Sequence, residues 1–269
     1  MSLTTASVID VHAHVILAET FGAAGALGPE MGGQNGDAPW FRVGEYRLDG
    51  VRYQGSAFMD TTLRLERMAD AGIDFQVISP NPLTFLHFIE SKMAVQFCDV
   101  HNTALHKVIV ENPDRLAGLA ALPMQDIPAA IAELERAVTE LGLLGALIGT
   151  DMPLPLDDPA MDAFYEACVR LNVPLFIHPS PAGIDGPMGD ANLREYDLDV
   201  VIGFAAQEAL ATARLIYGGV LDRHPELDIC ISHGGGSTGY LIGRMAMAAR
   251  KRPWASAAIK ADGAFEERL

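Results

Sequence analysis

Two histidines and an aspartate stand at alternate positions near the start of the chain, in the string IDVHAH of residues 9–14. This short run is typical of a strand, and side chains alternate along a strand, so Asp10, His12 and His14 are expected on one face. The Cα atoms of the two histidines would lie roughly 6.5–7 Å apart, close enough for both rings to bind one ion. The spacing therefore predicts a metal site.

Two further histidines stand at the ends of apolar runs. His178 directly follows the run PLFI of residues 174–177, and His233 follows ICIS at residues 229–232. In α/β barrels the ligands and catalytic groups gather at the carboxyl ends of the strands. We therefore expect four histidines on one rim of the fold: His12, His14, His178 and His233.

The remaining histidines carry weaker signals. His87 follows the second predicted strand, which places it on the same rim as a candidate contact to substrate. The others lie within or at the end of predicted helices, where a catalytic role is not indicated: His101, His106 and His224.

Two further stretches contain residues that occur in active sites but have simpler interpretations here. Residues 235–239 have the form G-x-S-x-G of α/β-hydrolases, but that fold needs the chain order Ser, acid, His, and no histidine follows Ser237. The glycines are interpreted instead as room for backbone to approach a ligand near the start of a helix. Asp151 follows another predicted strand and precedes a proline by two positions, a setting typical of turns.

The elements that must position these residues alternate along the chain. Apolar, β-branched runs are followed by amphipathic segments, which predicts an α/β fold with a parallel sheet covered on both faces. Six strands are predicted at 7–11, 75–79, 116–121, 145–149, 174–177 and 227–232. Six helices are predicted at 61–71, 92–111, 127–141, 159–171, 203–221 and 238–250.

The chain length of 269 residues suits one barrel of eight strand–helix units, which typically takes about 250 residues. We therefore expect a single domain over residues 1–269. A segment at about 21–59, with nine glycines and no clear period, is expected to be a functional cover or insertion, with a plain surface excursion as the alternative. Because only six units can be counted, the C-terminal one or two units are expected to lie beyond Leu269.

The charge of the chain limits the classes of partner that it is expected to bind. The chain has 19 Lys and Arg against 35 Asp and Glu, a net charge of −16 that repels phosphate backbones and anionic lipid. We therefore expect neither nucleic acid nor a membrane as a partner. Three scattered cysteines form no C-x-x-C pair, and no signal segment or apolar run of about 18 residues is evident. These features predict a cytoplasmic protein with reduced thiols.

The sequence resembles the amidohydrolase superfamily, and within it the branch of aminocarboxymuconate semialdehyde decarboxylase and the resorcylate-type decarboxylases. The resemblance covers nearly the whole chain. The D-x-H-x-H start is shared by the superfamily, whereas the decarboxylase branch is indicated by LPMQ at 122–125, His178-Pro179, HGGG at 233–236 and Gly243-Arg244. The resemblance implies a TIM-type (β/α)8 barrel of the metal-dependent hydrolase type.

The resemblance also implies roles for individual residues. His12, His14 and His178 would bind one divalent ion, zinc or else manganese, and His233 would be the acid/base. Two arginines would bind the carboxylate of a small-molecule substrate: Arg52, and Arg244 from the neighbouring subunit. The second role implies a homodimer or a higher homo-oligomer.

The sequence departs from the family at two places. Ser180 stands where the family has a tryptophan after His-Pro. The family's last metal ligand, an aspartate on the eighth strand, has no counterpart before Leu269, and Asp151 belongs to an earlier strand.

The four histidines, together with the resemblance to the decarboxylase branch, predict a divalent-metal-dependent decarboxylase acting on a small unsaturated or aromatic carboxylic acid. One alternative uses the same metal site to hydrolyse a lactone or amide, or to hydrate a double bond. A second alternative is a catalytically inactive barrel that serves as a binding or assembly subunit. Release of CO₂ separates the first two, and metal analysis tests the third.

Overall fold

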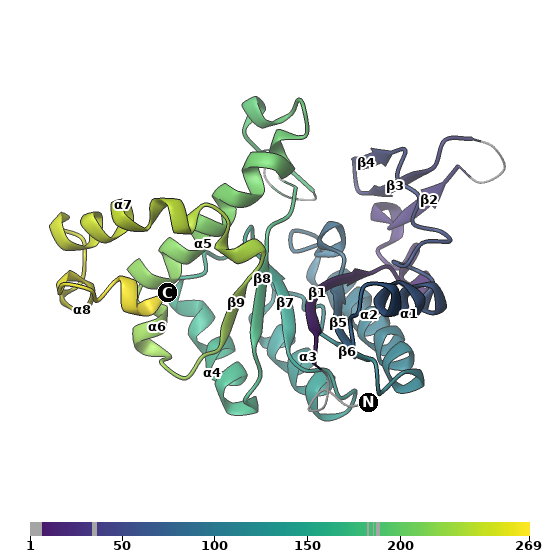
Figure 1. Cartoon of the computed structure of the whole chain (residues 1–269), viewed down its shortest axis with the longest axis horizontal. Coiled ribbons are helices and arrows are strands. Elements are labelled where there is room, and N and C mark those ends of the chain that lie inside the picture. The colour runs from purple at the N-terminus through teal and green to yellow at the C-terminus, as the bar shows by residue number, and fades with distance from the viewer. Residues whose placement is uncertain (1–6, 34–36, 182, 185, 187–188) are drawn as a thin grey trace.

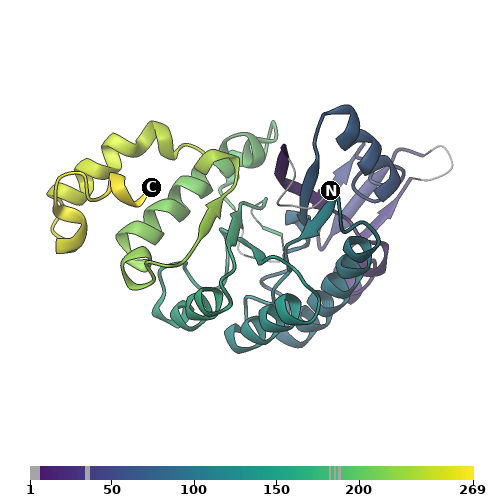
Figure 2. The same cartoon turned by 60° about the horizontal axis from the view of Figure 1, so that its bottom comes forward.

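The computed structural model describes residues 7–33, 37–181, 183–184, 186 and 189–269. Its centre is a curved sheet of parallel strands with helices along the outer side (Figures 1 and 2). The strands are β1 (Ile9–Val15), β5 (Phe75–Pro80), β6 (Leu116–Gly118), β7 (Ala146–Gly149), β8 (Leu175–His178) and β9 (Ile229–Ile231). All six strands predicted from the sequence are confirmed, with ends that differ by a few residues.

The strands lie side by side in chain order. β1 pairs with β5 and β5 with β6, while β7, β8 and β9 form a second set of parallel pairs. A parallel bridge between Ala120 and Ala146 joins the two sets. Parallel neighbours in chain order, each followed by helical structure, are the connections of a (β/α) barrel. Within the described ranges the row begins at β1 and ends at β9, so the one or two further units stay a prediction.

The helices of the outer layer begin where the sequence places good capping residues. The carboxylate of Asp60 accepts the N–H of Leu63, and that of Asp126 accepts the N–H of Ala129. The helices are α1 (Thr61–Asp70), α2 (Ser91–Glu111), α3 (Ile127–Thr139), α4 (Asp162–Leu171), α5 (Phe204–Tyr217), α6 (Val220–Arg223), α7 (Thr238–Lys251) and α8 (Ala257–Lys260). The six predicted helices are confirmed with shifted ends. The helix predicted at 203–221 is divided into α5 and the short α6, and α8 is an addition.

Apolar side chains pack on both faces of the sheet. Ile78, Ile148 and Ile177 belong to the core between the strands and the outer helices. Phe75 and Leu147 belong to a second cluster on the concave face. Burial on both faces explains the near-continuous apolar runs that identified these strands in the sequence.

The glycine-rich segment of residues 21–59 contains a small antiparallel sheet of β2 (Glu30–Gly32), β3 (Trp40–Val43) and β4 (Tyr46–Asp49). Phe41 and Val43 of β3 pack in one cluster with Leu83 and Phe97, which lie after β5 and in α2. The sheet therefore rests on the rim of the barrel-like body (Figure 1). Its strands have only three or four residues, which is too short for a sequence period to be visible.

One helical stretch among the described residues, Asp199–Tyr217, has the length and apolar composition of a membrane-spanning helix. It consists of a π-helical turn, Asp199–Gly203, followed by α5. Ala211, Leu215 and Ile216 of α5 are buried, and the helix packs against α6 and α7. The stretch is thus part of the helical layer that surrounds the sheet.

Candidate metal centre and its acid–base neighbour

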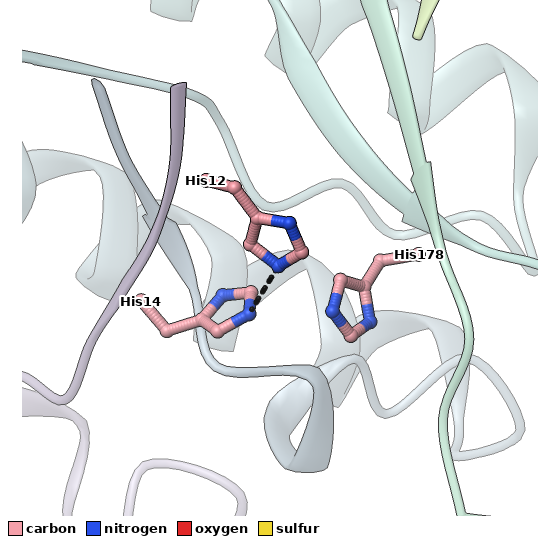
Figure 3. Close-up of side chains that lie close together, drawn as sticks. All are labelled: His12, His14 and His178. Carbon is pink, nitrogen blue, oxygen red and sulfur yellow. Dashed lines mark hydrogen bonds between the residues drawn. The ribbon is translucent and has the colours of Figure 1, made fainter. Parts of the chain in front are cut away.

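Three histidines converge at the carboxyl ends of two strands that are distant in the sequence. His12 and His14 lie on β1, and His178 is the last residue of β8. Their candidate ligand atoms all lie within 4.8 Å of one another, and the rings turn toward a common point (Figure 3). The Nε2 atoms of His12 and His14 are 3.3 Å apart. The structure therefore brings together the three residues that were predicted as metal ligands.

Backbone carbonyls fix the orientation of two of these rings. The Nδ1 atom of His14 lies 3.0 Å from the carbonyl of Pro80, and that of His178 lies 2.5 Å from the carbonyl of Pro179. A carbonyl only accepts, so each Nδ1 carries a proton and each Nε2 keeps its lone pair for the cluster. Metal-binding histidines are held in this way in many proteins.

Burial keeps the three rings neutral. It lowers the pKa of His178 to about 2 and that of His14 to about 4, and neighbouring histidines add to both shifts. Burial, with His233 nearby, also lowers the pKa of His12. Neutral imidazoles with free lone pairs are the form that binds zinc and similar divalent ions. The donor set therefore fits a divalent ion.

A fourth histidine stands beside the cluster with a carboxylate behind it. The ring centroid of His233 lies 4.7 Å from that of His178 and 4.8 Å from that of His12. Its Nδ1 atom is 2.6 Å from Oε1 of Glu208, a residue of α5 that is fully buried. The carboxylate accepts the Nδ1 proton, which leaves the lone pair of His233 on Nε2.

Glu208 was not identified from the sequence. Burial raises its pKa, while the hydrogen bond to His233 opposes that shift. The available signal was a lone acidic residue inside an otherwise apolar helical stretch, since a buried carboxylate needs a partner.

Gly236 makes room for this pair. A Cβ atom at Gly236 would lie 2.6 Å from Oε2 of Glu208 and 2.5 Å from the carbonyl oxygen of Ala205, and its φ of +58° also favours glycine. The sequence interpretation assigned the space at these glycines to a ligand. At Gly236 the space is occupied by α5 instead.

Asp10 lies outside the histidine cluster. The pairing of β1 with β5 shifts register between Asp10 and Ala13, and such a bulge interrupts the alternation of side chains. The carboxylate of Asp10 accepts the N–H of His12 at 3.0 Å and the side-chain amide of Gln76 at 2.8 Å. The expectation that Asp10 shares the face of the two histidines is therefore wrong.

A cavity of about 560 Å³ opens over the histidines. Its other walls are mostly apolar and aromatic, and they come from β4 and the segment after it, the segments after β5 and β8, the π-helical turn and the start of α5. They include Tyr46, Leu48, Tyr53, Phe58, Leu83, Pro181, Val200 and Phe204. The ring of Phe204 stacks beside that of His233 at 6.1 Å. A pocket of this size and character suits a small, flat organic molecule.

The three other predicted site residues lie away from this cavity. Arg52 is exposed and lines a smaller cavity beside Trp40, and Arg244 is exposed on α7. His87 is buried, where its Nε2 accepts the N–H of Gly149 at 3.1 Å and its ring stacks on Phe85. Their roles as substrate contacts stay predictions.

Comparison with known proteins agrees with this geometry. A family model described as amidohydrolase matches residues 9–261. The chain belongs to the amidohydrolase family.

Several relatives within the family carry names of their reactions. A 2-amino-3-carboxymuconate-6-semialdehyde decarboxylase from Dictyostelium discoideum is 35% identical over 72% of this chain and 53% of its own length. A gamma-resorcylate decarboxylase from Rhizobium radiobacter is 30% identical over 78% of this chain and 65% of its own length. A 2-keto-4-carboxy-3-hexenedioate hydratase from Sphingobium sp. is 31% identical over 67% of this chain and 53% of its own length.

Among solved structures, a dihydroxybenzoic acid decarboxylase from Polaromonas sp. is similar, with a TM-score of 0.69 and 25% identity. The likeness covers 94% of this chain and 72% of that one, which contains bound manganese and the inhibitor 2-nitroresorcinol. This chain thus spans about half to two thirds of the length of the curated relatives above.

Proposed function

We propose that this chain is a divalent-metal-dependent decarboxylase of small aromatic or unsaturated carboxylic acids. The observation that carries the proposal is the convergence of three neutral histidines, beside a carboxylate-backed His233, on a cavity with aromatic walls. The decarboxylases among its relatives support the same reaction class.

His12, His14 and His178 would hold the ion. A divalent ion supplies a Lewis acid that polarises a substrate oxygen and lowers the pKa of bound water. Imidazole ligands suit zinc, and the manganese in the Polaromonas structure supports manganese as the alternative. Metal analysis of the purified protein decides between them.

His233 would move the proton. Loss of CO₂ breaks a carbon–carbon bond and leaves the electron pair on the substrate carbon, where a proton must be added. Nε2 of His233 delivers that proton, and Glu208 stabilises the positive charge that the ring carries before the transfer. The aromatic walls bind the flat body of the substrate.

The test is CO₂ release by the metal-loaded protein from a panel of ortho-hydroxybenzoates and aminomuconate-type acids. In D₂O, the product is expected to carry deuterium at the carbon that lost its carboxyl group. His233→Gln should abolish turnover while metal stays bound. Metal-loaded, folded protein that releases no CO₂ from any of these acids would contradict the proposal.

Hydration or hydrolysis at the same site is the second candidate, and the hydratase among the relatives favours it. Such an enzyme would convert a substrate without CO₂, so the same assay with product analysis separates the two. An inactive subunit is the third candidate, and purified protein without stoichiometric metal would support it.

We also propose that the chain forms a homodimer through α7. Tyr240, Arg244 and Met247 share one face of this helix, and Tyr240 and Met247 are 93% and 51% exposed. Arg244 would then reach the partner's cavity and bind the substrate carboxylate, a role also proposed for Arg52 within the chain. Tyr240→Ser is expected to shift the sedimentation velocity toward the monomer.

A further inference from the structure

β1 carries two of the three metal-ligand candidates, but its backbone is not held by a regular ladder. The register shift between Asp10 and Ala13 interrupts its pairing with β5. Side chains bond to its backbone there: Asp10 accepts the N–H of His12 at 3.0 Å, Ser79 donates to the carbonyl of Ala13 at 3.0 Å, and Arg64 Nη2 donates to the carbonyl of His14 at 2.6 Å.

Two of these side chains are joined through a third. Arg64 Nη1 donates to Oε1 of Gln76 at 2.6 Å, and Nε2 of Gln76 donates to Oδ2 of Asp10 at 2.8 Å. Asp10, Gln76 and Arg64 therefore form a chain of hydrogen bonds, here called the β1 clamp. It begins at residue 10 of β1 and returns to β1 at the carbonyl of His14, so it spans the bulge.

Two of the three clamp members are buried, and Asp10 is half-buried. Arg64 and Gln76 are 6% and 7% exposed, and the guanidinium donates to two neutral oxygens, Oε1 of Gln76 and the carbonyl of His14. Burial lowers the pKa of Arg64 to about 10, so the group stays protonated and donates at neutral pH. A buried charge whose bonded partners are neutral costs free energy unless its hydrogen bonds are well made, and here they are short.

We propose that the β1 clamp positions His12 and His14 for metal binding, and that its three members are positioning residues rather than ligands. The inference rests on the metal site of the proposed function. Without the clamp, the carbonyl of His14 loses its partner and the bulge relaxes toward regular alternation. The two rings then no longer converge on one ion.

The test measures metal affinity apart from fold stability. Mn²⁺ is titrated calorimetrically into metal-free protein, and thermal melting is recorded on the same samples. Arg64→Met should raise the Kd for Mn²⁺ by about tenfold or more, as found when groups that orient metal ligands are removed. Arg67→Met, an exposed position on the same helix, is the matched control and should leave the Kd unchanged.

A second variant tests whether the clamp acts as one unit. Gln76→Leu should raise the Kd for Mn²⁺ by about the same factor as Arg64→Met. The double variant should bind Mn²⁺ with a Kd no higher than that of either single variant. Independent packing roles would instead make the two factors multiply, which would overturn the inference. If Arg64→Met does not fold, Arg64→Lys is measured against the same criterion, because an ammonium lacks the planar two-pronged donor geometry of the guanidinium.

Three further outcomes separate this inference from the proposed function. Arg64 variants that melt at lower temperature but bind Mn²⁺ like the wild type would show a purely structural role and overturn the inference. Wild-type protein that binds Mn²⁺ but releases no CO₂ would remove the proposed decarboxylation and leave the clamp to be judged by affinity alone. Wild-type protein that binds no Mn²⁺ would overturn both.

Discussion

β8 and β1 bring candidate metal ligands to the same point but hold them differently. β8 has neighbours on both sides, with Leu175–His178 in register with β7 and Leu175–Ile177 in register with β9. β1 pairs with β5 alone among the described strands, and its register shifts before His14. A strand inside the sheet is thus positioned by its ladder. A strand at the end of the row depends on side chains from α1 and β5.

The largest effect is expected from removing one candidate ligand, and it should be similar for β1 and β8. His14→Gln and His178→Gln should each raise the Kd for Mn²⁺ by at least about 100-fold, since each removes one of three imidazole donors. Calorimetry on the metal-free proteins checks this. If only one of the two substitutions weakens binding, the ion is not shared between β1 and β8.

The next largest effect should distinguish the candidate metal ligands from the pair of His233 and Glu208. Glu208→Gln keeps the shape of the side chain but removes its charge, so kcat should fall about 100-fold with an unchanged Kd for Mn²⁺. Glu166→Gln, at an exposed position of α4, is the control and should match the wild type. A loss of metal affinity in Glu208→Gln would place that residue in the metal site instead.

A smaller effect should distinguish the two strands directly. Ser79 bonds both the ring of His14 and the carbonyl of Ala13, so Ser79→Ala should weaken Mn²⁺ binding about tenfold. Ser180 follows His178 after one residue, and the position of His178 is set by the ladder. Ser180→Ala should therefore have no effect. Equal losses in the two variants would refute the contrast between β1 and β8.

The smallest effect concerns a buried histidine outside the site. Burial lowers the pKa of His101 to about 4 in the folded chain. Below about pH 6.5 the unfolded chain binds a proton at this histidine, whereas the folded chain does not bind it until the pH approaches 4. Stability should fall as the pH drops from 6.5 toward 4. Between pH 6.5 and pH 5, the free energy of unfolding of His101→Leu should fall by about 1–2 kcal/mol less than that of the wild type. Urea unfolding at the two pH values measures the difference. Parallel pH profiles would show that His101 does not contribute.

The sequence was sufficient for the strands and for the histidines at their ends, because burial on both faces leaves continuous apolar runs. It failed at Asp10, since a bulge depends on partners such as Gln76 and Arg64 that are distant in the sequence. Glu208 was missed because its partner, His233, lies 25 positions away and on another element. The small sheet of residues 30–49 was missed because its strands are too short for a period.

The parallel order of the strands also sets when the metal centre is completed. His14 and His178 are 164 positions apart, and three of the six strands of the row, β5, β6 and β7, lie wholly between them. Contacts of such sequence separation form late, after the intervening loops have been closed. We therefore expect that an ion at this site does not nucleate folding, in contrast to sites whose ligands are close in sequence. Metal-free protein is expected to fold first and take up Mn²⁺ afterwards.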